Sequence, residues 1–170
     1  VARDPFFIVG REPFPNFKFG DLRMLKFASV SEVPTPWICL ANDIRRAGVA
    51  PDSLQRVRDK TMAENEAALR AGTVDAIQVF QPFAERLVRS GKGHIWYAAA
   101  NRGLTAYTTL VTRRDILAAK RDELLRMTRA VHRTLGWFAT TQALEIAGLL
   151  ERYFPDVPTE LFAQCIERYR

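Results

Sequence analysis

The sequence predicts an α/β fold in which a mainly parallel sheet is flanked by helices and is followed by a helical C-terminal portion. Two observations predict this fold. Between residues 21 and 103, short apolar runs alternate with amphipathic segments, which is the order expected of parallel strands joined by helical crossovers. From Arg114 onward only the helical spacing of apolar residues remains.

The positions of apolar residues, Gly and Pro set the expected bounds of these elements. Strands are expected at residues 5–10, 26–30, 54–58, 74–80, 94–99 and 104–112, and helices at 34–48, 62–72, 82–90, 114–120, 121–140, 141–153 and 159–169. Asp21 is expected to cap a short helical turn before the second strand. Residues 11–20 contain prolines and aromatic residues without periodicity, so an irregular segment is expected there.

The stretch from Met62 to Phe83 indicates a binding crevice. Its pattern is that of a helix that stops at Gly72, a strand covered on both faces, and a second helix opened by Pro82. Gln81 would then lie at the carboxyl end of a strand, where open α/β sheets bind ligands.

The turn SEVPTPW, residues 31–37, is expected at the same edge of the sheet, where it opens a helix. Free N–H groups at a helix start favour an anion, a carbonyl or another acceptor. Ser31 and Thr35 fit two roles equally well, as ligand contacts or as caps of the helix, and Trp37 fits either the core or a ligand contact. The sequence favours structural or solvent-facing roles for His94 and His132.

The composition is that of a globular protein and argues against two classes of function. The chain is 48% apolar and 26% charged, and no apolar run approaches the roughly 20 residues needed to span a bilayer. The net charge of +6 comes from Arg residues scattered among Asp and Glu, which favours solvated helix faces over a nucleic-acid interface.

Two cysteines, Cys39 and Cys165, lie in apolar helical contexts, which favours free thiols over a disulfide, and the sequence leaves their pairing open. No motif predicts a metal site or a cofactor. The chain begins with Val1, so it is expected to be processed or cut from a longer protein, and the absence of a signal segment says nothing about secretion.

Three stretches carry a resemblance to a known family through their order and spacing. They are DLRMLKFASVSEVPTPW (21–37), ENEAALRAGTVDAIQVFQPF (64–83), and LTAYTTLVTRRDIL (104–117) followed by KRDELLRMTRAV (120–131). The chain resembles the SsuA/THI5-like group of type II periplasmic binding proteins, which serve ABC importers for nitrate, sulfonate, taurine and pyrimidine precursors and include NMT1. The resemblance covers nearly the whole chain.

This resemblance implies a two-lobed organisation. Residues 1–20 would form a hinge strand and a remnant of the first lobe, residues 21–103 the second α/β lobe, and residues 104–170 a hinge strand and the helical C-terminal part of the first lobe. The N-terminal part of the first lobe, which normally supplies half of the ligand contacts, would be missing. Binding by this chain alone is therefore left open, and the uncovered apolar surface is expected to cause self-association.

The resemblance also implies the residues that would face a ligand, in the two turns and near the hinges: Ser31, Glu32, Thr35, Trp37, Gln81, Phe83, Asn16, Arg102 and Tyr107. Gln81 stands where an acidic residue is common in the family, which weakens any preference for a cationic group. No catalytic residue and no metal ligand is implied.

The implied function is that of a non-enzymatic solute-binding component of an ABC-type importer. Such a protein captures a small organic or oxyanion solute between two hinged lobes and presents the closed surface to the transporter permease. It would be periplasmic or extracellular and associated with a membrane that it does not span. Two alternatives are a ligand-sensing regulatory domain, for which a helix-turn-helix should precede Val1, and a pyrimidine-precursor synthase-like enzyme, which is disfavoured because the chain lacks a cysteine cluster.

Overall fold

Five strands form one sheet in the first of the two units of the computed structural model, which describes residues 3–169. Their order across the sheet is β3-β2-β4-β1-β5. Strand β2 is parallel to β3 and β4, whereas β1 is antiparallel to both of its neighbours, β4 and β5. Four strands therefore run in one direction and β1 alone runs against them, which confirms the predicted mainly parallel sheet. The strands are β1 (Phe7–Gly10), β2 (Lys26–Ala28), β3 (Gln55–Val57), β4 (Ala76–Val79) and β5 (His94–Ala98).

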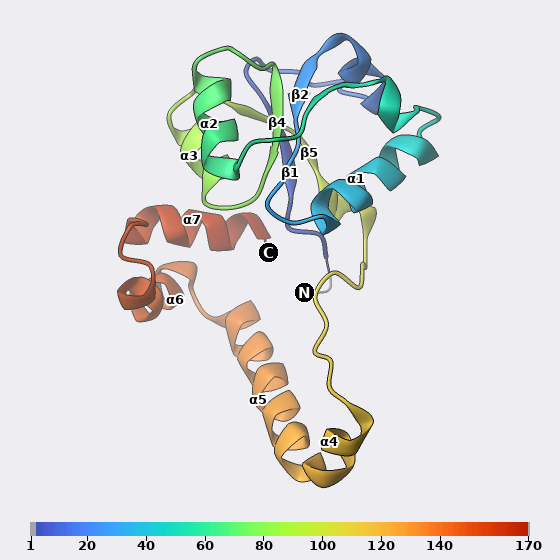
Figure 1. Ribbon diagram of the computed structural model, residues 1–170. Coiled ribbons are helices and arrows are strands. Elements are labelled where there is room, and N and C mark those ends of the chain that lie inside the picture. The colour runs from blue at the N-terminus through green and yellow to red at the C-terminus, as the bar shows by residue number, and fades with distance from the viewer. Residues whose placement is uncertain (1–2, 170) are drawn as a thin grey trace. The chain divides into compact units, whose positions relative to one another are not determined.

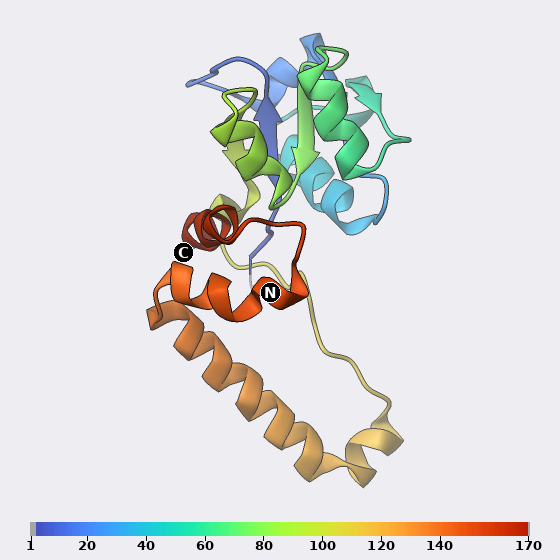
Figure 2. The same cartoon turned by 90° about the vertical axis from the view of Figure 1, so that its left-hand side faces the viewer.

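Helices cover both faces of this sheet, as Figures 1 and 2 show from two directions. Helix α1 packs on one face, and α2 and α3 pack on the other. Three short 3-10 segments complete the unit, and Asp21 caps the first of them by accepting a hydrogen bond from the Lys18 N–H. The helices are α1 (Thr35–Arg46), α2 (Met62–Arg70) and α3 (Phe83–Arg89), and the 3-10 segments are Phe19–Met24, Pro51–Ser53 and Ala99–Arg102.

The two faces of the sheet bury different sets of apolar residues because successive side chains of a strand point in opposite directions. In β1, Ile8 packs towards α1, while Val9 packs towards α2 and α3. In β4, Ala76 and Ile77 divide in the same way. This double burial explains the uninterrupted apolar run around β4 and confirms the strand that was predicted there.

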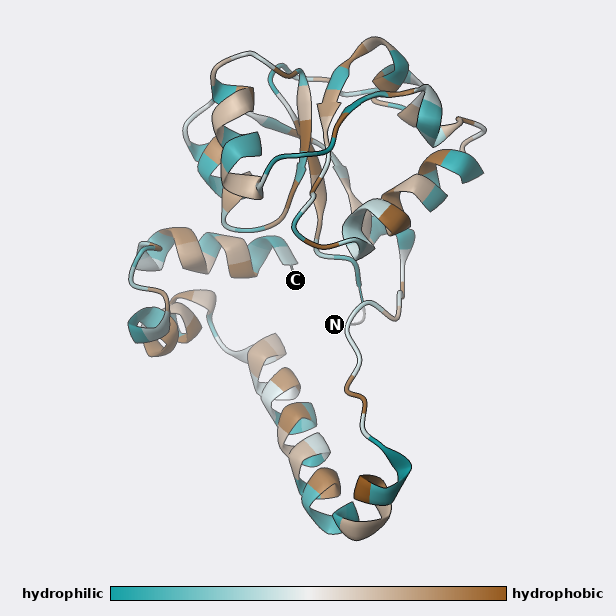
Figure 3. Ribbon diagram, in the orientation of Figure 1, coloured by the Kyte–Doolittle hydropathy of each residue, from teal (hydrophilic) through white to brown (hydrophobic). Residues whose placement is uncertain are grey.

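The second unit, residues 108–170, is helical in the part that the structure describes. Helices α6 and α7 share a small core of Ala143, Ile146, Ala147, Ala163 and Ile166. Neither α4 nor α5 contains a buried residue, and apolar and polar residues alternate visibly along α5 in Figure 3. The helices are α4 (Arg114–Ala119), α5 (Arg121–Thr140), α6 (Ala143–Leu150) and α7 (Thr159–Tyr169), with a 3-10 turn at Glu151–Tyr153.

The predicted strand at residues 104–112 is wrong. This segment is irregular, and within residues 3–169 it pairs with no strand. Its β-branched and aromatic residues suit a pleated surface, but such a preference produces a strand only where a neighbouring strand supplies the hydrogen-bonding edge.

The other predicted strands and helices are present, with bounds that differ by a few residues. Within the described part of the chain, no helix is both long and apolar enough to cross a membrane.

Gly10 allows β1 to pass close to the indole ring of Trp96, which is held by a 2.7 Å hydrogen bond from its Nε1 to the Glu12 carbonyl oxygen. A Cβ atom on Gly10 would lie 1.7 Å from Cζ2 of Trp96. We therefore expect Gly10→Ala to lower the free energy of unfolding by about 1–3 kcal/mol, the usual cost of overpacking. The matched control is Gly20→Ala, whose Cβ meets nothing within 4 Å. Equal unfolding midpoints for the two variants in urea would contradict this account.

Candidate functional site

The carboxyl ends of β2, β3, β4 and β5 lie at one edge of the sheet, which we call the carboxyl edge. The chain leaves β2, β3 and β4 at this edge and enters α1, α2 and α3 respectively. The first turns of three helices and the turns that precede them therefore converge there. Open α/β sheets bind ligands at such an edge, so it is the candidate functional site.

The turn between β2 and α1 is joined to the turn between β3 and α2 by two side chains that were predicted to contact a ligand. The hydroxyl of Ser31 donates a 2.5 Å hydrogen bond to the carbonyl oxygen of Lys60. The carboxylate of Glu32 accepts a 2.8 Å hydrogen bond from the N–H of Met62, the first residue of α2. Glu32 therefore places negative charge at the start of α2, where the helix dipole favours it. Both residues are exposed and so remain accessible to a ligand.

Two buried amide side chains fix the same turn from within the sheet. Gln78, in the middle of β4, donates from Nε2 to the Pro36 carbonyl oxygen at 2.9 Å and accepts from the Val30 N–H at 3.4 Å. Asn65 on α2 donates from Nδ2 to the Ser29 carbonyl oxygen at 3.3 Å. Neither residue was among those predicted to form the site. The signal that was available is a Gln inside the apolar run of β4 and an Asn on the inward face of a helix.

Thr35 and Trp37 lie on the first turn of α1. Thr35 is exposed, while Trp37 is half-buried against the core on the α1 side of the sheet. The guanidinium carbon of Arg56 lies 3.7 Å from the centroid of the Trp37 ring. Burial lowers the pKa of Arg56, and the nearby charge of Arg58 lowers it further. Part of Trp37 therefore packs on the core, and its half-exposed ring leaves the predicted ligand contact possible in geometry.

The turn between β4 and α3 contains the other two residues predicted there. Gln81 is buried, and its Oε1 accepts a 2.9 Å hydrogen bond from the Glu85 N–H. Phe83 is the first residue of α3 and is half-buried, with the Arg86 guanidinium 4.9 Å from its ring centroid. The structure therefore brings six predicted residues to the carboxyl edge: Ser31, Glu32, Thr35, Trp37, Gln81 and Phe83.

Asn16 is not brought to this edge. Because β1 runs against the other strands, its last residue, Gly10, pairs with Ala76 and His94, the first residues of β4 and β5. The segment that follows β1 therefore begins at the opposite, amino edge. Asn16 is exposed there, in a turn of that segment.

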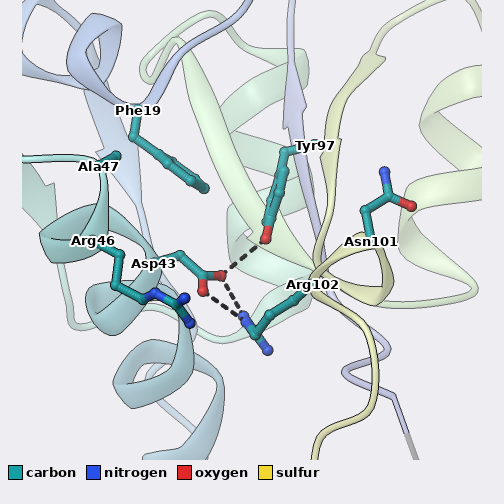
Figure 4. Close-up of a pocket in the computed structure, with 7 residues that line it drawn as sticks. All are labelled: Phe19, Asp43, Arg46, Ala47, Tyr97, Asn101 and Arg102. Atoms are coloured by element: carbon teal, nitrogen blue, oxygen red, sulfur yellow. Dashed lines mark hydrogen bonds and ion pairs between the residues drawn. The ribbon is translucent and has the colours of Figure 1, made fainter.

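Arg102 reaches inward to two carboxylates. Its Nε donates to Asp43 Oδ1 at 2.7 Å, its Nη2 donates to Asp43 Oδ2, and its Nη1 donates to Asp4 Oδ2 at 3.0 Å. The hydroxyl of Tyr97 donates to Asp43 Oδ2 at 2.9 Å. Figure 4 shows how Asp43, Tyr97 and Arg102 converge beside a hollow of about 380 Å³ that is open to solvent. We call Asp4, Asp43, Tyr97 and Arg102 the Arg102 network.

Two members of the Arg102 network, Arg102 and Tyr97, have raised pKa values. Hydrogen bonds to Asp43 raise the pKa of Arg102, so that its charge is permanent. Burial raises the pKa of Tyr97, and donation to Asp43 raises it further, so the phenol stays protonated. The predicted ligand contact at Arg102 is in this structure an internal cross-link. Its partners lie 59 and 98 positions away along the chain, which sequence spacing does not reveal.

Tyr107 packs at the end of the first unit. Its ring centroid lies 6.3 Å from that of Phe6, the residue that precedes β1.

Both cysteines are free thiols, with Cys165 buried and Cys39 half-buried. Among residues 3–169, no cluster of three or more His, Cys, Asp or Glu side chains is placed to hold a metal ion.

A model of the NMT1-like family matches residues 18–150. The chain belongs to the NMT1-like family. The candidate binding protein YtlA of Bacillus subtilis is 23% identical over 169 residues, which are 98% of this chain and 51% of YtlA.

Solved structures share the fold of this NMT1-like chain. The periplasmic aliphatic sulphonate binding protein SsuA of Escherichia coli matches with a TM-score of 0.75 at 18% identity, over 98% of this chain and 56% of SsuA. The alkanesulfonate-binding protein SsuA of Xanthomonas axonopodis pv. citri, bound to MOPS, matches with a TM-score of 0.63 at 19% identity, over 97% and 55% of the two chains. A ligand-binding component of an ABC-type import system from Staphylococcus aureus matches with a TM-score of 0.66 at 15% identity, over 98% and 56%.

These matches confirm the predicted family and the periplasmic-binding-protein-like fold. The NMT1-like chain spans about half the length of the relatives that it matches. The three structural neighbours are named as binding components and not as enzymes.

The buried amide of Gln78 allows a test of how the site is held. Gln78→Leu would leave the Val30 N–H and the Pro36 carbonyl without this partner, and each buried polar group left unsatisfied costs about 1–3 kcal/mol. We expect a large loss of unfolding free energy in urea denaturation. The control is Gln55→Leu on the exposed side of β3, for which a change within about 0.5 kcal/mol is expected. Similar losses in both variants would show that Gln78 does not have this role.

Cys39 on α1 reports on the charges of the Arg102 network. Burial raises the pKa of its thiol, and so does the negative charge of Asp4. Asp4→Asn removes that charge, so the pKa of Cys39 should fall and the midpoint of its pH–rate profile for alkylation should move to lower pH. The experiment uses a Cys165→Ser background and Asp52→Asn as the control. A midpoint that stays in place while only the rate changes would indicate altered access to the thiol, and would contradict the electrostatic account.

Proposed function

We propose that this NMT1-like protein is the solute-binding component of an ABC-type importer. It captures a small organic or oxyanion solute between two hinged lobes, and the unit of residues 1–107 forms most of one lobe. The observation that carries this proposal is the convergence of three helix starts with exposed polar and half-buried aromatic side chains at the carboxyl edge, in a chain whose fold is shared with binding proteins of import systems.

The chemistry of the carboxyl edge suits a solute with an acceptor group and a flat or apolar body. The first N–H groups of α1 have no partner within their own helix and attract an acceptor or an anion. Thr35 adds a hydroxyl beside them, and Trp37 and Phe83 offer aromatic surface. The hydroxyl of Ser31, which donates its proton to Lys60, and the carboxylate of Glu32 can only accept, so they suit a donor group elsewhere on the solute.

The hydrogen bonds that fix the turn before α1 support high affinity. A loop that is already ordered loses less conformational freedom when it binds a ligand. Gln78 and Asn65 order this turn from inside, while Ser31 and Glu32 tie it to the start of α2. The site is therefore prepared before the solute arrives.

The solute proposed for first testing is an organic sulfonate. Two of the structural neighbours are named for binding sulfonates, and a sulfonate presents three acceptor oxygens to the N–H groups of a helix start. Pyrimidines, aromatic acids and inorganic oxyanions complete the set of solutes to be compared.

The proposed organisation follows the boundaries that the resemblance implies, with one addition from the sheet. Residues 21–103 form the lobe that contains the site, and β1 from the segment 1–20 completes its sheet. The residues before β1 and residues 104–170 contain the connections to the other lobe and its helical part. Closure of the lobes buries the solute and presents the closed surface to the membrane component of the importer. The protein then acts in the periplasm or at the outer surface of a membrane, and it releases its solute unchanged.

A thermal-shift screen of these solutes on the protein as the cell makes it is the first experiment. A ligand at 100 times its Kd adds about 2.7 kcal/mol to the free energy of unfolding, so the genuine solute should raise the Tm clearly. The absence of a shift with every solute class at millimolar concentration would contradict the proposal.

The position of the site is tested by Trp37→Leu and Phe83→Leu. Each variant removes aromatic surface at the carboxyl edge, and we expect at least a tenfold higher Kd, or about 1.4 kcal/mol, by calorimetric titration with the solute found in the screen. Asn16→Ala at the amino edge is the control and should bind like the wild type. Wild-type affinity in both aromatic variants would move the site away from this edge.

A further inference from the structure

The segment through which the chain enters the first unit lies beside the segment through which it leaves. Strands β1 and β5 are neighbours in the sheet, and their ladder is extended by one hydrogen bond from the Ala99 N–H to the Phe6 carbonyl oxygen, 2.9 Å long. The entering segment contains Asp4, just before β1, and the leaving segment contains Arg102, just after β5. Both segments lie at the carboxyl edge because β1 is antiparallel to the other strands.

Arg102 connects these two segments to a third element, α1. Its guanidinium donates to Asp4 on the entering segment and, with two nitrogens, to Asp43 on α1. The Phe6 N–H also donates to Asp4, at 3.0 Å, which orients the carboxylate. One planar cation therefore holds two carboxylates that come from distant parts of the chain, a task for which the forked geometry of Arg is suited.

These contacts are shielded from water. The side chains of Asp4 and Asp43 are 1% and 7% exposed, and that of Arg102 is 15% exposed. In such surroundings ion pairs are screened far less than at the surface. Loss of the cation would leave two buried carboxylates with no counter-charge from Arg102 and with neutral donors, the Tyr97 hydroxyl and the Phe6 N–H, which is a strongly unfavourable arrangement.

Helix α1 connects the Arg102 network to the candidate site at the carboxyl edge. Asp43 lies eight positions after Thr35, about 12 Å along a rigid helix at 1.5 Å per residue. The start of α1 is held separately, by the hydrogen bond from Gln78 to the Pro36 carbonyl oxygen. The helix is thus attached to the sheet near its first turn and to the connecting segments near its last turns.

We propose that Arg102 is a positioning residue for solute binding: through Asp4 and Asp43 it couples the segments that enter and leave this lobe to α1, and so to the carboxyl edge. This inference rests on the proposed function. The same residue was expected to contact the solute directly, and the contacts of its guanidinium point to an indirect role instead. When the lobes close, a displacement of the connecting segments is transmitted to α1 and to the turn that opens it.

The first test needs no solute. Hydrogen exchange is compared between the wild type and Arg102→Gln, and we expect exchange to rise by at least about tenfold at residues 99–103 and along α1, where local opening becomes easier. Exchange in β4 should remain unchanged, because that strand does not depend on the network. The control is Leu69→Ala, which removes a fully buried side chain of α2 on the other face of the sheet. Equal exchange at residues 99–103 in wild type and Arg102→Gln overturns the proposal, as does an equal rise in Leu69→Ala.

The second test measures binding of the solute identified by the screen. Arg102→Gln should raise the Kd by about tenfold or more and reduce the ligand-induced change in distance between labels on the two units, measured by energy transfer. Arg102→Lys keeps the charge but lacks the fork, so it should recover only part of the affinity. Wild-type affinity and wild-type closure in Arg102→Gln overturn the positioning role while leaving the proposed function intact.

If the wild type binds none of the solutes, both the proposed function and the role of Arg102 in binding are overturned. The exchange experiment still decides whether Arg102 fixes the two segments. If Arg102→Gln fails to fold, Asp4→Asn/Asp43→Asn/Arg102→Gln takes its place. This triple variant leaves no buried charge without a partner and keeps the size of the side chains at positions 4 and 43. It should fold and show the same rise in exchange at residues 99–103, and wild-type exchange there overturns the proposal.

Discussion

The antiparallel direction of β1, an interior strand between β4 and β5 of an otherwise parallel sheet, is the constraint on which the rest of the first unit depends. A strand of that direction brings the start of the unit to the carboxyl edge, next to the end of β5. Asp4 and Arg102 can therefore meet although 98 positions separate them. The same direction sends residues 11–25 to the amino edge, so that Asn16 lies apart from every other predicted ligand residue of this unit.

Because both faces of the sheet are covered, polar groups that act on a solute are confined to its edges. The interior admits very few polar side chains, and those present at the carboxyl edge serve its turns. Gln78 and Asn65 give up contact with water and satisfy backbone groups of the segment between β2 and α1. A buried amide that satisfies backbone groups makes a loop more rigid, which favours recognition of a small molecule.

Periodicity in the sequence was sufficient for most of the fold. The run around β4, the stop at Gly72 after α2, and the Pro residues that open α1 and α3 all act over short distances, and the corresponding elements lie within a few residues of where they were predicted. Residues 104–112 have strand-forming side chains, but a strand also requires a partner, and composition does not specify one. The direction of β1 is likewise a property of its neighbours rather than of its own residues.

The candidate site was likewise predictable where it depends on residues close together in the sequence, and not where it depends on distant ones. Turn chemistry predicted that residues 31–37 and 81–83 meet at one edge, because each follows a strand of the same direction. It did not predict Asp43 as a partner of Arg102, since an Asp on an amphipathic helix is normally a solvated residue and nothing nearby in sequence marks it as buried.

Stability alone is a weak reason for a buried ion network of this kind. Apolar side chains of similar volume often stabilise a protein as well as a buried ion pair does, because both charges lose their hydration. Apolar packing does not fix the relative orientation of the groups that it brings together. The fork of Arg102 requires one orientation of Asp43 and one position of Asp4, so the entering segment, the leaving segment and α1 are held in a single arrangement. In the proposed function the connections of the lobe move as a unit during closure and depend on that arrangement, and a Leu or Met at position 102 would fill the space without enforcing it.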